Sequence, residues 1–156
     1  MKKKIVSGIL VLFLSLNSLF AAGNKDVSAE VKASFNKEFV NAEHVQWDSF
    51  DELVRATFLL NNQSLSAFYH SDGELVALTR NISPEQLPAH LLIQLKANYM
   101  QYWISELVEI YIDGGTQYYA TLDNGETILT VKSNSGEYWQ TERKKRNKIF
   151  HNNLKK

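Results

Sequence analysis

One sequence module is present twice along most of this chain. Arg55–Phe58 precedes an alternating run that ends at Ser71–Glu74, and about 64 positions later Tyr119–Leu122 precedes a similar run that ends at Asn134–Glu137. An amphipathic helical pattern comes before each copy. A single copy of roughly 60 residues would be marginally stable alone, so the copies are expected to share a sheet. The sequence therefore predicts an α+β fold, a tandem repeat of a helix plus antiparallel strands with the helices packed on one face of a shared sheet.

The spacing of apolar residues locates two helices. Val31, Phe35 and Phe39 recur at helical spacing and predict a helix over residues 28–40. The second helix is predicted to end near Tyr102 and to begin either after Ser83, as a capped start, or only at Pro88. Alternating segments separated by turn residues predict the strands, which fall near residues 45–47, 52–60, 65–70, 75–80, 107–112, 117–122, 127–132 and 138–141.

The first 22 residues have the pattern of a secretory signal peptide. Three lysines at 2–4 precede an apolar stretch over 5–16, and the small residues Ala21, Ala22 and Gly23 follow. Cleavage is expected between Ala21 and Gly23. The apolar stretch is shorter than the ~20 residues that span a bilayer, so no stable membrane span is expected after cleavage. An uncleaved N-terminal anchor is the alternative. The chain is predicted to be exported, to the periplasm.

Composition limits the remaining choices. The 156 residues include no Cys, so an exported form has no disulfides and must be stable through its core alone. Without the three signal lysines the chain has 14 basic and 17 acidic residues, a balance of −3. Proteins that bind nucleic acid usually have the opposite sign, so a nucleic-acid partner is not expected.

The rest of the chain divides into a domain and a basic tail. Residues 23–141 are predicted to form one domain with repeats at about 27–80 and 84–141. Residues 142–156 hold seven basic residues against one acidic residue. We expect a frayed tail or a short terminal helix there. It could contact anionic lipid or an acidic partner, or simply be solvated.

The residues that enzymes need are missing from the sequence. There is no Cys nucleophile, no Gly-x-Ser-x-Gly elbow and no phosphate-binding glycine loop. The four histidines occur singly at His44, His70, His90 and His151. His70 and Asp72 together would bind a metal only weakly, and a polar strand end beside a turn explains them better, because a catalytic metal normally has three protein ligands. We predict no catalytic residues, no metal site, no cofactor and no enzyme.

Strand alternation suggests an open face for recognition. It assigns six apolar residues to the buried face: Val54, Ala56, Phe58, Val108, Ile110 and Ile112. The opposite set includes Arg55, Tyr111 and Tyr119, with Tyr138 or Trp139 beside them according to register. Because Tyr, Trp and Arg dominate binding energy at protein interfaces, the predicted partner-binding residues are Arg55, Tyr111, Tyr119 and Trp139. The alternative is that aromatic residues are simply good strand formers.

The segment from Phe39 to Trp47 also resembles a known family. The segment resembles the PepSY-like family, also called beta-lactamase-inhibitor-like, at Phe39, Ala42, Val45 and Trp47. It departs from the family pattern at Val40, where Pro is usual. Leu87-Pro88 matches the Leu-Pro before the family's second helix. The resemblance covers about residues 27–141. It implies two tandem helix-and-sheet repeats and no established activity.

The inhibitor name of that family comes from a protein that grips an enzyme with the open face of its sheet and inserts an acidic hairpin. No inhibitory residue of that kind is matched in this chain. The sequence thus predicts a non-enzymatic exported binding module that presents an open sheet face to a periplasmic or envelope protein or peptide. The alternative is a structural or envelope-stress accessory protein without a discrete site, and an enzyme comes third.

Overall fold

The fold was analysed in a computed structural model that describes residues 27–50, 52–134 and 136–146. The predicted signal peptide, residues 1–22, and its cleavage site lie outside the described residues, as does the predicted tail from residue 147 onward. Residues 142–146 of that tail belong instead to the last strand. No helix within the described ranges is long and apolar enough to span a membrane.

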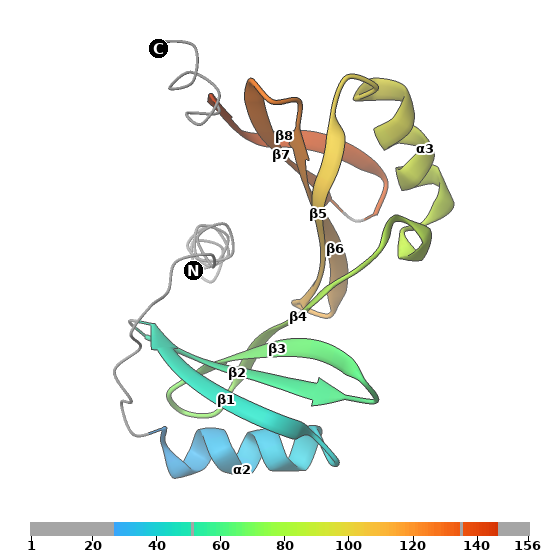
Figure 1. The fold of residues 1–156 in the computed structure, drawn as a ribbon. Helices are drawn as coiled ribbons and strands as arrows, with labels where there is room; N and C mark the ends of the chain where they lie inside the picture. Colours follow the sequence, from blue (N-terminus) through green and yellow to red (C-terminus); the bar gives the residue numbers. More distant parts are fainter. Residues whose placement is uncertain (1–26, 51, 135, 147–156) are drawn as a thin grey trace.

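A single antiparallel sheet is the main element of the fold (Figure 1). Its eight strands pair in sequence order, each with the next. The strands are β1 (Glu43–Phe50), β2 (Leu53–Leu60), β3 (Gln63–His70), β4 (Leu75–Asn81), β5 (Trp103–Ile112), β6 (Gly115–Asp123), β7 (Thr127–Asn134) and β8 (Tyr138–Arg146). The helical elements are α2 (Ala29–Glu38), the 3-10 turn η1 (Pro84–Gln86) and α3 (Ala89–Asn98).

The predicted fold class, a tandem repeat of helix-plus-strand units, is wrong. The described residues form one open eight-stranded sheet to which two ten-residue helices are added. The ladder continues without a break across its middle, where β4 pairs with β5 from Ala77↔Ile112 to Asn81↔Val108. Each α-helix has only two buried residues, so pairing between strands organises the fold more than helix packing does.

Helix α2 covers part of the first four strands. Ser28 caps it, since its side-chain oxygen accepts a hydrogen bond from the Val31 backbone N–H at 3.2 Å. The buried Phe35 ring lies edge-on to the rings of Trp47 and Phe58, with centroids 5.1 and 4.9 Å away. Phe39 and Trp47 are partly buried against this cluster.

Helix α3 covers part of the last four strands. Ser83 begins only the 3-10 turn, and its backbone N–H donates to Gln86 Oε1 at 2.9 Å. The α-helix proper follows Pro88, the later of the two predicted starts. Leu91 and Leu95 are its buried residues. They pack with strand residues that include Leu107, Ala120, Leu122, Val131 and Trp139.

Strand register shows that both helices lie on one face of the sheet. Leu78 packs in the α2 cluster and pairs with Tyr111 on β5. Tyr111 and Leu107 are four residues apart on one strand and so share a face. Leu107 packs in the α3 cluster. We call this side the outer face. Figure 1 shows the sheet bending sharply near β4 and β5, with α2 and α3 outside the bend. The opposite side is the inner face.

The inner face has a buried cluster of its own. Cross-strand pairs place Ala77 opposite Ile112 and Phe68 opposite Ala77. The members of this inner cluster are Phe68, Ala77, Ile110, Ile112 and Tyr119. Their burial means that the middle strands are apolar on both faces.

Candidate functional site

The structure divides the four predicted partner-binding residues between the two faces of the sheet. Tyr119 pairs with Val108 and belongs to the inner cluster. Arg55 alternates with the helix-facing Ala56 and therefore also lies on the inner face. Tyr111 and Trp139 lie on the outer face. The four residues thus do not form one patch.

Trp139 was placed on the wrong face by sequence reasoning. Its side chain is 8% exposed and packs in the α3 cluster. Its indole Nε1–H donates to the Leu91 carbonyl oxygen at 2.9 Å. Tyr111 is also misplaced, because it pairs with the outer-face Leu78, although its side chain remains 49% exposed. The error arose from treating Val108, Ile110 and Ile112 as helix-facing, whereas they are apolar residues of the inner side.

The two residues that do lie on the inner face are far apart in the sheet. Arg55 on β2 binds Asp48 on β1, with its Nη2 2.6 Å from the carboxylate, and its side chain is 16% exposed. Tyr119 on β6 is 7% exposed, and burial raises the pKa of its hydroxyl above the ordinary value. The Lys132 ammonium lies 5.5 Å from the centroid of its ring. Both side chains are therefore already engaged within the protein.

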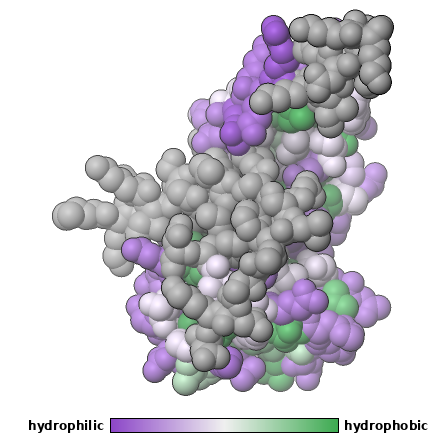
Figure 2. All heavy atoms as spheres, turned by 60° about the vertical axis from the view of Figure 1, so that its left-hand side comes forward, coloured by the Kyte–Doolittle hydropathy of each residue, from purple (hydrophilic) through white to green (hydrophobic). Residues whose placement is uncertain are grey.

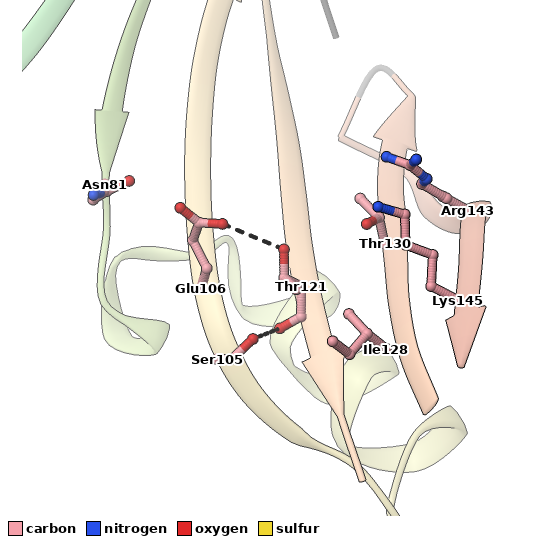
Figure 3. A pocket seen from close by; sticks show the side chains of 8 residues that line it. All are labelled: Asn81, Ser105, Glu106, Thr121, Ile128, Thr130, Arg143 and Lys145. Atoms are coloured by element: carbon pink, nitrogen blue, oxygen red, sulfur yellow. Dashed lines mark hydrogen bonds between the residues drawn. The ribbon is translucent and has the colours of Figure 1, made fainter. Parts of the chain in front are cut away.

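A groove on the inner face was not predicted from the sequence. It has a volume of about 510 Å³ and lies over the last five strands. Figure 3 shows Asn81 and Glu106 on one side of it and Arg143 and Lys145 on the other. We call it the inner groove. Its lining residues are Asn81, Ser105, Glu106, Thr121, Ile128, Thr130, Arg143 and Lys145.

Two irregularities in strand pairing shape the inner groove. On β5 the register shifts between Ile104 and Glu106, so that Ser105 is opposite no residue of β6 in the strand pairing and lines the groove together with Glu106. On β8 the register shifts beside Glu142. A one-residue shift transfers the following side chains to the other face of a sheet. Arg143 and Lys145 therefore point into the groove, although regular alternation from Trp139 would place them on the outer face.

The two walls of the inner groove differ in charge. On the β5–β6 side, the Thr121 hydroxyl donates to Glu106 Oε2 at 3.4 Å, and the Ser105 hydroxyl donates to the Thr121 carbonyl oxygen at 3.0 Å. On the β8 side, Arg143 and Lys145 are exposed, and neither has an ion-pair partner among the described residues. One wall thus holds an engaged carboxylate and the other holds two available cations.

The sequence did contain a sign of this groove. Arg143 and Lys145 were assigned to a basic tail, because the charge run conceals the alternation of a strand. Ile128 and Thr130 alternate with the buried Leu129 and Val131, which marks an inner-face row on β7. The bulge beside Glu142 could not be located, since no glycine or other turn residue marks it.

The described residues contain no cluster of three or more His, Cys, Asp or Glu side chains that could hold a metal ion. His90 Nε2 instead contacts the Gly136 carbonyl oxygen and helps to join α3 to the β7–β8 turn. His70 lies at the end of β3, beside the turn that contains Asp72.

Figure 2 brings the inner side forward, and hydrophilic residues predominate over the upper part of its described surface.

Comparison with known proteins shows the fold alone. No family model and no curated protein matches the chain. Among solved structures, a BLIP-like protein from Bacteroides fragilis shares 14% identity at a TM-score of 0.65, covering 76% of this chain and 85% of that one. A DUF2874 family protein from Bacteroides uniformis shares 14% identity at a TM-score of 0.68, and the match covers 76% of this chain and 88% of that one.

A third solved structure covers more of this chain than these two. It is a protein from Bacteroides eggerthii, provisionally named as periplasmic, with 14% identity and a TM-score of 0.68. The match covers 82% of this chain and 94% of that one. The chain therefore has a BLIP-like fold, and the PepSY-like assignment stays a prediction.

Proposed function

We propose that this protein is an exported, non-enzymatic binding module that holds a protein partner on the inner face of its sheet. The observation that carries the proposal is the inner groove. It is a polar depression of about 510 Å³ on the face of the sheet opposite the helices. Helices α2 and α3 already pack against the outer face. Within the part of the chain that the structure describes, no helix packs against the inner face, so this is the face proposed for the partner.

The contents of the inner groove favour binding over catalysis. Its ionisable groups are Glu106, Arg143 and Lys145. Acid–base catalysis usually relies on a group whose pKa is shifted toward neutrality, typically beside a second reacting group. The only carboxylate of the groove accepts a hydrogen bond from Thr121 and faces no second acid or histidine of the lining. Such a surface is suited to recognition through charge and hydrogen bonds.

Export is supported by the order of basic, apolar and small residues at the N-terminus. The provisional periplasmic name of the Bacteroides eggerthii protein agrees with it. We propose the periplasm as the site of action, with cleavage between Ala21 and Gly23. N-terminal sequencing of the protein from its host tests this, and a retained Met1 on a cytosolic protein would contradict it.

Site-specific crosslinking tests the binding face. A photo-reactive amino acid is placed at Asn81, which is exposed at the inner groove, and in a matched variant at Ile93, which is 65% exposed on α3. Irradiation in living cells is expected to give a discrete adduct with one protein from Asn81 and none from Ile93. Equal adducts from both positions, or an adduct from Ile93 alone, would remove the inner face as the binding surface. No adduct at either position would favour the accessory protein without a discrete site.

A further inference from the structure

We infer that the inner groove receives an extended segment of the partner protein whose alternate residues are acidic, with the carboxylates against Arg143 and Lys145. This inference rests on the proposed function and specifies the chemistry of the partner. The occupant is a peptide segment with side-chain carboxylates.

The first step is charge. Arg143 and Lys145 are exposed side chains of the groove lining and have no ion-pair partner among residues 27–50, 52–134 and 136–146. Arg55 and Arg80 differ in this respect, since Arg55 binds Asp48 and Arg80 binds Glu109 at 2.7 Å. Two adjacent free cations in a concave site attract an anion more strongly than isolated surface charges do. A carboxylate also matches the planar fork of an Arg side chain.

The second step is spacing. Arg143 and Lys145 are two residues apart on β8, which places their backbone positions about 6.6 Å apart along the strand. An extended peptide that runs along β8 repeats its side chains on one face with the same spacing. Acidic residues at alternate positions can therefore meet both cations at once, whereas a single small anion can use only one or share both at longer distance.

The third step is the width and composition of the floor. Between its charged walls, Glu106 on β5 and Arg143 on β8, the groove spans three strand spacings or about 14 Å, and it continues to Asn81 on β4. That width accommodates one extended chain with its side chains. The floor offers hydroxyl groups from Thr121 and Thr130 and an apolar contact from Ile128. A peptide can use both kinds of contact.

The fourth step is orientation. Glu106 lies on the wall opposite the two cations, and its Oε2 accepts a hydrogen bond from Thr121 (Figure 3). An acidic side chain directed toward β5 would meet this carboxylate and be repelled. The two walls therefore allow an acidic segment with its carboxylates toward β8 and disfavour the reverse placement.

The test uses synthetic peptides with both ends capped, so that no terminal charge contributes. One probe is ten residues of alternating Glu and Thr, and the control is ten residues of alternating Gln and Thr. Binding to the purified protein is followed by fluorescence anisotropy, and the site is mapped by amide shifts in two-dimensional NMR. We expect the Glu peptide to bind at least about tenfold more tightly than the Gln peptide, with shifts in β6–β8. Equal binding of both peptides would overturn the inference.

Matched variants separate the groove from general charge attraction. R143Q/K145Q removes two positive charges from the groove, and K32Q/K37Q removes two from exposed positions on α2. We expect the first to weaken binding of the Glu peptide at least about tenfold and the second to change it less than twofold. Equal weakening by both would show non-specific attraction. R143E/K145E is expected to prefer a peptide of alternating Lys and Thr.

Other anions form the last arm of the test. Inorganic phosphate at millimolar concentration and vesicles of phosphatidylglycerol are offered in competition with the Glu peptide. If either displaces it at concentrations where chloride does not, the groove is an anion or lipid site and the peptide inference fails. The crosslink at Asn81 remains a separate result. An adduct there without recognition of the Glu peptide refutes only this inference, and loss of both refutes the proposed function as well.

Discussion

The indole nitrogen of Trp139 donates a hydrogen bond to the backbone carbonyl oxygen of Leu91 at 2.9 Å. This contact joins the edge strand β8 to helix α3. Two further contacts reinforce it, since Gln94 Nε2 donates to the Glu137 carbonyl oxygen at 2.8 Å and His90 contacts that of Gly136. Arg143 lies on the same strand, so the helix on the outer face helps to position the cations of the inner face.

Replacing Trp139 is expected to destabilise the protein strongly. Truncation of a buried aromatic residue costs about 3–5 kcal/mol, so Trp139→Ala should lower the free energy of unfolding by that amount. Trp139→Phe keeps most of the packing and loses the hydrogen bond, and we expect a smaller loss, about 1 kcal/mol beyond the change in ring size. Urea unfolding measures both. A loss below about 1 kcal/mol for the Ala variant would return Trp139 to the list of surface residues.

Substituting Gly73 and Gly114 allows the cost of a steric clash to be compared with the cost of backbone strain alone, because both residues have positive φ. Gly73 has φ +88° and Gly114 has φ +74°. A Cβ at Gly73 would lie 2.8 Å from Ser34 Oγ and 3.0 Å from the Glu30 carbonyl oxygen, whereas one at Gly114 would meet nothing within 4 Å.

Gly114→Ala should therefore cost only the left-handed strain of about 1–2 kcal/mol. Gly73→Ala should cost about 1–3 kcal/mol more, because α2 must move away from the turn. Thermal or urea unfolding of the two variants gives the comparison. Equal losses would mean that α2 adjusts to the added methyl group without measurable cost.

Tyr69 is expected to make stability depend on alkaline pH. Its side chain is fully buried, and its hydroxyl donates to Glu38 Oε2 at 3.0 Å. Burial, and secondarily this hydrogen bond, raise the pKa of Tyr69 far above its ordinary value near 10. The unfolded chain therefore loses this proton near pH 10 while the folded protein keeps it.

Because the pKa of Tyr69 is higher in the folded protein than in the unfolded chain, its contribution to stability is fully present below the unfolded-state pKa. This contribution is lost as the pH rises above about 10. The unfolding free energy should thus fall between pH 9 and 11. Tyr69→Phe has no such proton to lose, so its decline should be shallower by up to about 1.4 kcal/mol per pH unit. Chemical unfolding at several pH values measures the slope. Parallel declines of the two proteins would show that Tyr69 does not account for it.

The sequence predicts the strands better than it predicts their faces. Alternation and turn residues located the strands and both helices, although β1, β5 and β8 are longer than predicted and α3 ends before the predicted Tyr102. The prediction of which residues share a face was wrong at β5. Val108 packs against the inner cluster and Leu107 packs in the α3 cluster, so both neighbours are apolar. When both sides of a strand are buried, the hydrophobic pattern no longer distinguishes them. The fold class was wrong for a different reason: the repeat in the sequence was taken as the unit of the fold, whereas the described residues form one continuous eight-stranded sheet with two short helices added.

The candidate site could not be predicted because it depends on two bulges. Arg143 and Lys145 face the inner groove only because Glu142 interrupts the regular pairing of β8 with β7. Ser105 has the corresponding position on β5. A bulge results from the balance of ladder hydrogen bonds and side-chain packing across several strands. Neither Glu142 nor Ser105 is a residue type that indicates a bulge in the sequence. Charge and residue type were visible in the sequence, whereas the face was not.

Arg55 was predicted to be a partner-binding residue, and its contact with Asp48 now allows a sharper prediction. The two side chains are 16% and 25% exposed, with Nη2 2.6 Å from the carboxylate and a second contact from Nε at 3.1 Å. Both nitrogens contact the same carboxylate oxygen, Oδ2, and the pair is partly buried, so a double-mutant cycle of Arg55→Ala and Asp48→Ala should give a coupling of about 1 kcal/mol that decreases in high salt.

The same two variants distinguish a structural role of Arg55 from a role in recognition. If the ion pair only stabilises the β1–β2 pairing, both single variants should lower stability similarly and leave the crosslink from Asn81 unchanged. If Arg55 also anchors the partner, Arg55→Ala should weaken that crosslink, while Asp48→Ala, which frees the guanidinium from its carboxylate, should preserve or increase it. Because Arg55 lies on β2 and the inner groove spans the last five strands, we expect the first result for a partner seated in the groove. Weakening by Arg55→Ala alone would extend the binding surface across the whole inner face.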